Sequence, residues 1–229
     1  MNKKDKFIQL FDAARAVIFD FDGVLADSEK WHFITYSEVF ARYGHTIDET
    51  EYYKYWTSLG LGAEGEINRF GLDLDPAAIR DEKRPVFSER CRDGSIGLFP
   101  EAFEILVRLG TTGRTLTIAS GTPAPDIVAI LDNAGVRSAF AEIIGSDTVP
   151  AIKPAPDLFL AMLERLALPG NDCVVIEDAE KGMQASIASG IPVIVIRTSE
   201  TRDFDFSDAD LVLDSHGEFL ELARGAFPG

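Results

Sequence analysis

Short apolar runs alternate with amphipathic stretches over the second half of the chain. The apolar runs, which the pattern predicts as buried strands, lie at 115–119, 140–144, 173–176 and 193–196, and 211–213 could add an edge strand. The amphipathic stretches predict helices at 100–109, 123–133, 156–168, 180–189 and 218–224. Strands and helices that alternate at this spacing favour a parallel sheet with right-handed crossovers.

The region from 28 to about 95 breaks this alternation. Just before it, the apolar run 16–19 predicts the first strand of the sheet. Within it no run of β-branched residues stands out, and the pattern predicts helices at 29–43, 48–57, 64–70 and 76–92. Pro85 should kink or interrupt the last of these.

These elements predict an α/β fold in two domains. Residues 1–27 and 97–229 would form a Rossmann-like parallel sheet flanked by helices. Residues 28–96 would form an α-helical cap domain inserted after the first strand. We expect hinges between the two domains at 27–28 and 93–97.

Composition narrows the class of partner. Of the 229 residues, 46% are hydrophobic and 26% charged, which is ordinary for a soluble globular protein. The net charge of −16 argues against nucleic acid or an anionic membrane as partner. No membrane span or signal peptide is evident. Cys91 and Cys173 lie far apart and are expected to be reduced and buried. We therefore expect a cytoplasmic protein, as a monomer or weak dimer.

Two predicted strands end in pairs of acidic residues. Asp20 and Asp22 follow the strand at 16–19, and Glu177 and Asp178 follow the strand at 173–176. Carboxylates at the ends of buried strands are costly unless a cation balances them, and parallel strands bring their carboxyl ends to one edge of the sheet. Oxygen ligands of this kind suit Mg²⁺. The sequence therefore predicts a magnesium site at this edge.

Two further loops at the same edge carry polar residues. Ser120 and Gly121 precede a predicted helix, where a hydroxyl and free N–H groups can cradle a phosphate, although the same pattern is typical of an ordinary helix cap. Lys153 lies in the loop before the next helix. A single loop lysine is usually just solvated, but a phosphoryl group beside carboxylates needs one fixed cation.

Together the four loops resemble the haloacid dehalogenase-like hydrolases, in the branch with a helical cap after the first strand. The matching segments, in chain order, are DFDGVLADS, IASGTP, the lysine of IKPAPDLF, and VIEDAEKG. The later segments are similar to those of phosphoglycolate phosphatases and β-phosphoglucomutases. The resemblance extends from residue 17 to about 196.

The resemblance implies a role for each strand-end residue. Asp20 would be the nucleophile that forms an aspartyl-phosphate, and Asp22 the general acid and base. An aspartate at each of these positions implies phosphoryl transfer, since true dehalogenases of the superfamily lack this arrangement. Ser120, Gly121 and Lys153 would hold the phosphoryl group.

The same resemblance implies a Mg²⁺ site and a mobile cap. Asp20, the backbone carbonyl of Asp22, Glu177 and Asp178 would bind the metal. Mg²⁺ and Lys153 would then offset the repulsion between the nucleophile and the phosphate. The cap would close over the site and exclude water.

The cap residues bear on the substrate. His32 matches a histidine that contacts substrate in the β-phosphoglucomutase branch, although a lone histidine on a helix is more often merely packed. The loop 58–65 contains no Arg or Lys for a distal phosphate, which argues against a mutase or a bisphosphate substrate unless Lys54 or Arg69 reaches the pocket. The aromatic cluster at 52–56 should be mainly cap core, with one ring free to stack on a sugar.

The resemblance and the residues favour a Mg²⁺-dependent phosphatase acting on a small phosphorylated metabolite, either a sugar phosphate or a short acid resembling phosphoglycolate. The closest alternative is a phosphomutase of the β-phosphoglucomutase type. A receiver-like switch would need no helical cap, and the presence of Asp22 argues against storage of an acyl phosphate. A dinucleotide-binding domain is disfavoured because no G-x-G-x-x-G follows a predicted strand.

Overall fold

A six-stranded parallel sheet forms the centre of the molecule in the computed structural model, which describes residues 1–58, 60–202 and 204–227. Its strands, in the spatial order β3-β2-β1-β4-β5-β6, are β1 (Ala16–Phe19), β2 (Thr115–Ala119), β3 (Glu142–Ile144), β4 (Cys173–Glu177), β5 (Val193–Ile196) and β6 (Leu211–Leu213). The predicted parallel α/β fold is therefore confirmed, including the edge strand β6.

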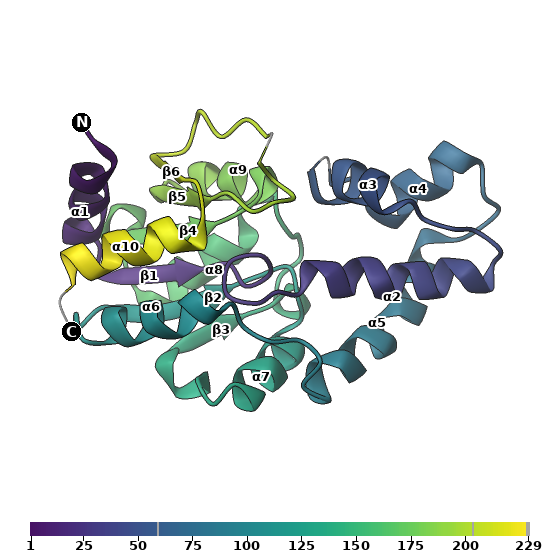
Figure 1. Cartoon of the computed structure of the whole chain (residues 1–229), viewed down its shortest axis with the longest axis horizontal. Helices are drawn as coiled ribbons and strands as arrows, with labels where there is room; N and C mark the ends of the chain where they lie inside the picture. Colours follow the sequence, from purple (N-terminus) through teal and green to yellow (C-terminus); the bar gives the residue numbers. More distant parts are fainter. Residues whose placement is uncertain (59, 203, 228–229) are drawn as a thin grey trace.

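Helices cover both faces of this sheet (Figure 1). They are α1 (Lys3–Ala13), α6 (Pro100–Gly110), α7 (Ala124–Asn133), α8 (Asp157–Leu166), α9 (Glu180–Ala188) and α10 (His216–Ala226), with short 3-10 turns η2 (Arg137–Ala139), η3 (Ser146–Thr148) and η4 (Gly170–Asp172). Alternate residues of β1 enter separate cores: Val17 and Phe19 pack with α1, α6, α7 and α10, whereas Ala16 and Ile18 pack with α8 and α9. Burial on both faces explains why the strand is apolar throughout.

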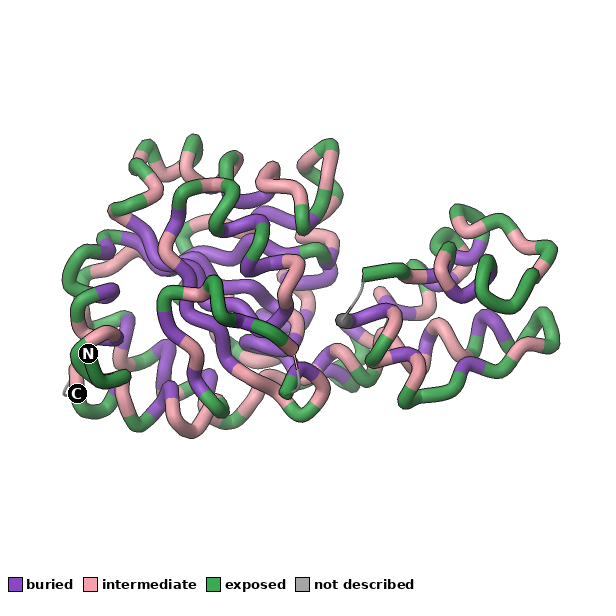
Figure 2. Tube along the Cα trace, turned by 90° about the horizontal axis from the view of Figure 1, so that it is seen from above, coloured by how far each residue is buried: buried purple, intermediate pink, exposed green. Residues whose placement is uncertain are grey.

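A second group of helices lies beside the sheet, beyond the tip of β1 (Figures 1 and 2). It comprises α2 (Glu29–Arg42), α3 (Glu49–Tyr52), the π-helix η1 (Tyr53–Ser58), α4 (Gly62–Phe70) and α5 (Pro76–Arg92). These helices have a hydrophobic cluster of their own, formed around Phe40, Trp56 and Ile67. We call residues 28–96 the cap; its status as a separate domain, with hinges at its ends, remains a prediction.

Of the two effects expected of Pro85, a kink or an interruption, the interruption does not occur in the long helix α5. The helix is unbroken from Pro76 to Arg92, with Pro85 inside it. It packs against α2 and against α7, so that Ile79 belongs to the cap cluster and Phe87 to the core cluster. This packing outweighs the single backbone hydrogen bond that proline removes.

The N-terminal helix α1 and the two cysteines also bear on the sequence predictions. The sequence pattern did not predict α1, which packs Phe7 and Phe11 against α10. Cys91 and Cys173 are free and buried, as expected. No helix in the described part of the chain is both long and apolar enough to cross a membrane.

Candidate active site

The register of the sheet brings the predicted residues to one edge. Phe19 at the end of β1 pairs with Ile118 of β2 on one side and with Ile176 of β4 on the other. Asp20 directly follows β1, Ser120 directly follows Ala119 at the end of β2, and Glu177 is the last residue of β4. The three residues therefore lie at the same edge of the sheet, on neighbouring strands.

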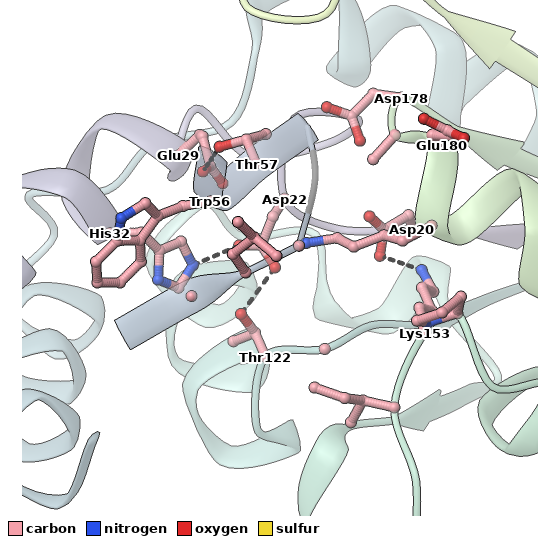
Figure 3. Close-up of a pocket in the computed structure, with 18 of the residues that line it drawn as sticks. Asp20, Asp22, Glu29, His32, Trp56, Thr57, Thr122, Lys153, Asp178 and Glu180 are labelled. Atoms are coloured by element: carbon pink, nitrogen blue, oxygen red, sulfur yellow. Dashed lines mark hydrogen bonds and ion pairs between the residues drawn. The ribbon is translucent and has the colours of Figure 1, made fainter. Parts of the chain in front are cut away.

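A cavity of about 600 Å³ opens between these strand ends and the cap. Its lining on the sheet side includes Asp20, Asp22, Gly121, Thr122, Lys153 and Asp178, and on the cap side Glu29, His32, Tyr36, Trp56 and Arg80. Figure 3 shows the acidic residues of the strand ends and the cap residues facing the same space. The cavity is large enough for a phosphorylated metabolite.

Three buried carboxylates form a cluster at the sheet side of the cavity. One oxygen from each of Asp20, Glu177 and Asp178 lies within 4.8 Å of the others. Lys153 contacts two of them: its Nζ lies 2.7 Å from Asp20 Oδ1 and 2.7 Å from Glu177 Oε1. Although burial opposes it, the charges of Asp20 and Glu177 raise the pKa of Lys153 above its ordinary value.

The cluster carries more negative charge than one lysine balances. Burial raises the pKa of Asp20 to about 7. The charge of Lys153 opposes this shift, whereas the charges of Glu177 and Asp22 add to it. Burial, followed by Glu177 and Asp20, raises the pKa of Asp178 well above its ordinary value. A divalent cation would relieve this repulsion, and an all-oxygen donor set suits Mg²⁺. The residues present therefore fit such an ion.

Two glycines allow the carboxylates to approach. A Cβ on Gly182 would lie 1.6 Å from Glu177 Oε1, and a Cβ on Gly23 would lie 2.0 Å from Asp178 Oδ2. Gly23 also has a φ of +74°, which disfavours other residues. Glu177 is further fixed because Oε2 accepts the backbone N–H groups of Asp178 at 2.8 Å and Ala179 at 2.9 Å.

Asp22 lies in a different environment from Asp20. Its Oδ1 accepts a hydrogen bond from Ser28 Oγ at 2.6 Å, and its Oδ2 accepts from Thr122 Oγ1 at 2.7 Å and Ser120 Oγ at 3.0 Å. Burial alone would raise the pKa of Asp22, but the hydrogen bond from His32, followed by those from Ser28 and Thr122, lowers it below its ordinary value. Asp22 is thus held ionised.

His32 connects Asp22 to a lysine that the sequence analysis did not single out. His32 Nε2 lies 3.3 Å from Asp22 Oδ1, and His32 Nδ1 lies 2.7 Å from Lys83 Nζ. The imidazole stacks on Phe87 with ring centroids 4.0 Å apart. Because an ammonium can only donate, Lys83 donates to Nδ1 and His32 presents its Nε2–H to Asp22. Lys83 comes from α5, and nothing in its local sequence marks it.

The two remaining predicted residues, Ser120 and Gly121, differ in whether they line the cavity. Gly121 lines the cavity, whereas the Ser120 side chain is fully buried and donates to Asp22. Thr122, the next residue of the same loop, also donates its hydroxyl to Asp22.

The cap contributes one cation that we did not expect. Arg69 pairs with Glu51 and Glu66, and Lys54 lies over the ring of Tyr55; neither is among the described residues that line the cavity. Arg80 of α5 does line it. From the loop 58–65, residues 60–64 line the cavity and Leu59 lies outside the described residues.

The chain is similar to known proteins in sequence and in structure. A family model described as haloacid dehalogenase-like hydrolase matches residues 17–196. The plasmid-encoded protein CbbY of Cupriavidus necator is 32% identical over 232 residues, covering 94% of this chain and 91% of that protein. The fructose-1-phosphate phosphatase YqaB of Escherichia coli is 29% identical over 189 residues, covering 82% and 99%.

A solved structure extends the comparison to three dimensions. The crystal structure of a mutant CbbY from Rhodobacter sphaeroides, in complex with xylulose-(1,5)bisphosphate, superposes with a TM-score of 0.76. It is 30% identical in sequence, and the match covers 90% of this chain and 96% of that one. The likeness therefore includes both the sheet and the helical cap.

Proposed function

The chain belongs to the haloacid dehalogenase-like hydrolase family and is a phosphatase, and from this premise we propose that it hydrolyses a small sugar phosphate with Mg²⁺ as cofactor. The observation that carries the proposal is the position of Asp20, which lies in the acidic cluster, contacts Lys153 and lines the cavity. The names of relatives support a sugar: one acts on fructose 1-phosphate, and another binds xylulose-(1,5)bisphosphate.

In the first proposed step Asp20 attacks the phosphorus atom. Lys153 holds Oδ1, which leaves the other oxygen to form the new bond. The bond between phosphorus and the ester oxygen breaks, giving an aspartyl-phosphate and an alcohol. The negative charge of the bound phosphoryl group raises the pKa of Asp22, so that Asp22 can carry the proton that passes to the leaving oxygen.

In the second step Asp22, ionised again, accepts a proton from water. The water oxygen attacks phosphorus, the acyl-phosphate bond breaks, and Asp20 is regenerated with release of inorganic phosphate. The hydrogen bonds from Ser28, Ser120 and Thr122 keep the Asp22 carboxylate oriented for both transfers. These three hydrogen bonds thus suit a residue that first donates and then accepts one proton.

We propose that Asp20, Asp178 and the backbone carbonyl of Asp22 hold Mg²⁺, with Glu177 completing the acidic set. When bound, the ion would neutralise negative charge on the phosphoryl oxygens and on the nucleophile. Glu177 already contacts Lys153 and two backbone N–H groups, so its main contribution is to fix that lysine.

The test is release of inorganic phosphate from a panel of phosphorylated metabolites, with Mg²⁺ and with a chelator. We expect Mg²⁺-dependent release from sugar phosphates and its loss in Asp20→Asn. An exposed aspartate of the core, changed in Asp208→Asn, provides the matched control and should retain activity. Turnover by Asp20→Asn at the wild-type rate would contradict the proposal.

One observation favours a second candidate, a phosphomutase. Arg80 lines the cap side of the cavity and has no carboxylate partner within 4.0 Å among the described residues, so it could bind a distal phosphate. A mutase would require a bisphosphate primer and would release little phosphate. The same panel, assayed for isomerised sugar phosphate as well as for phosphate, separates the two activities.

A further inference from the structure

Glu29, the first residue of α2, is a carboxylate in the cavity with no cation beside it. Its Oε1 accepts a hydrogen bond from Thr57 Oγ1 at 2.6 Å. In the described part of the chain no Lys, Arg or His nitrogen lies within 4.0 Å of its oxygens. Thr57 is buried at 7% exposure and comes from the π-helix η1, a rare form that often occurs at functional sites.

A second hydroxyl lies near the same carboxylate. Tyr52 is buried at 3% exposure. Burial and then the charge of Glu29 raise the pKa of Tyr52 well above its ordinary value, which keeps the phenol neutral. The hydroxyl groups of Thr57 and Tyr52 therefore both lie beside the Glu29 carboxyl group.

Glu29 also lies close to the proposed phosphoryl site. It lines the cavity together with Asp20 and Asp178, and its charge is one of the causes that raise the pKa of Asp178. In Figure 3 Glu29 and Thr57 lie on the cap side of Asp22. A substrate whose phosphoryl group is at Asp20 and whose carbon skeleton extends towards the cap would bring that skeleton to the side of the cavity that Glu29 lines.

A carboxylate in this position can accept hydrogen bonds but cannot donate them. A hydroxyl on the carbon next to the phosphorylated carbon would satisfy it. A carboxylate on that carbon skeleton would instead bring two negative charges together in a partly desolvated space. Glu29 should thus favour binding of a sugar phosphate and disfavour binding of a phosphorylated acid, the two substrate classes that the sequence leaves open.

We propose that Glu29 is a specificity-determining residue that selects hydroxyl-bearing substrates and rejects phosphorylated carboxylic acids, with Thr57 as its positioning residue. The proposal rests on the proposed phosphatase function for its choice of substrates. It concerns the carbon next to the phosphate, whereas Arg80 would act on a more distant group.

Two substrates, fructose 1-phosphate and 2-phosphoglycolate, test this selection. We expect the wild-type kcat/KM to be at least about 100-fold higher for the sugar. In Glu29→Gln, which keeps the shape and removes the charge, this ratio should fall by about 10-fold or more, with an absolute gain for phosphoglycolate. Glu38→Gln changes an exposed carboxylate on the same helix and should leave the ratio unchanged.

The positioning role of Thr57 can be tested separately. Thr57→Val should raise KM for the sugar phosphate with little change in kcat, because the hydroxyl acts only through the orientation of Glu29. Thr57→Ser keeps the hydroxyl and should restore the wild-type KM. Equal KM values for the valine and serine variants would contradict the positioning role.

Binding to a protein with Asp20→Asn separates this proposal from the proposed function. We would titrate that variant, with and without Glu29→Gln, with each substrate by calorimetry in the presence of Mg²⁺. Preference for the sugar that disappears with Glu29→Gln supports the selection even if the wild type proves inactive. Turnover of both substrates by the wild type without a preference, or a preference that survives Glu29→Gln, overturns it and leaves the phosphatase function intact.

Discussion

Asp20 and Asp22 are separated by one residue, yet their surroundings shift their pKa values in opposite directions. Burial and the charge of Glu177 raise the pKa of Asp20, whereas hydrogen bonds from His32, Ser28 and Thr122 outweigh burial and lower the pKa of Asp22. Asp20 is thus suited to bind a cation, and Asp22 is suited to exchange a proton. Strand alternation would place Asp20 and Asp22 on one face, but β1 ends at Phe19, and beyond it the two side chains enter different surroundings.

Lys83 carries a prediction about stability and pH. Burial, against the charges of Asp22 and Glu29, lowers the pKa of Lys83 from 10.5 to about 8. Between pH 8 and 10.5 the unfolded chain binds more protons than the folded one, so the cost of burying this charge is fully present below pH 8 and disappears above 10.5. That cost is about 3 kcal/mol.

We therefore expect Lys83→Met to gain stability relative to the wild type at pH 7 and to lose that advantage as the pH rises towards 10.5. Urea denaturation across this pH range measures the difference. Lys30→Met changes an exposed amine of the cap and is the control. A difference between Lys83→Met and wild type that is constant with pH would show that the lysine is not buried as a charged group.

The sequence reveals only part of this residue network. The acidic pairs were predictable because buried strands ending in two acids are unusual, and the register of a parallel sheet brings strand ends together. Lys83 and Arg80 were not, because they lie on a helix whose pocket-facing side depends on how α5 packs against α2. Glu29 was likewise indistinct, since an acid in the first helical turn is expected at any helix N-terminus.

At the level of elements, α5 joins the hydrophobic cluster of the cap to one of the two cores of the sheet. Ile79 packs in the cap and Phe87 in the core, and Ser88 Oγ donates to Asp126 of α7 at 2.9 Å. The strands of the sheet could be predicted because each is a compact apolar run. The continuity of α5 could not, because local rules place a break at Pro85, and only contacts with α2 and α7 overcome it.

Pro85 supplies a prediction at this scale. A proline inside a helix removes one backbone hydrogen bond, so Pro85→Ala should raise the free energy of unfolding by about 1–3 kcal/mol. Pro76 begins the same helix, where proline is favourable, and Pro76→Ala should bring no gain. Urea denaturation of both variants provides the comparison. An equal effect of the two substitutions would contradict this assignment of strain to Pro85.

At the scale of the whole molecule, a net charge of −16 surrounds a site that must admit an anion. The field of the protein as a whole repels phosphate esters, so attraction has to come from within the cavity. Lys153, Arg80 and a bound cation would supply it. The overall architecture was predictable from the order of elements; the composition of the cap wall was not, since it depends on how η1, α4 and α5 face the strand ends.

The excess charge predicts that divalent cations stabilise the folded chain. Mg²⁺ that binds only the folded state should raise Tm by several degrees, on the order expected from a few kcal/mol of binding linkage. Asp178→Asn should abolish this increase, and Asp208→Asn should not. Thermal unfolding in Mg²⁺ and in NaCl of equal ionic strength distinguishes binding from general screening. The same rise in NaCl would argue against a specific site.

The continuity of α5 restricts how this protein can change in length over evolution. Inserting or deleting one residue in an α-helix turns everything beyond it by about 100°. In α5 such a change would rotate Arg80 away from the cavity and Lys83 away from His32 while Phe87 stayed fixed in the core. Length variation should therefore be tolerated in the turns of the cap and excluded from this helix, so that the spacing between Lys83 and the sheet is inherited as a fixed unit.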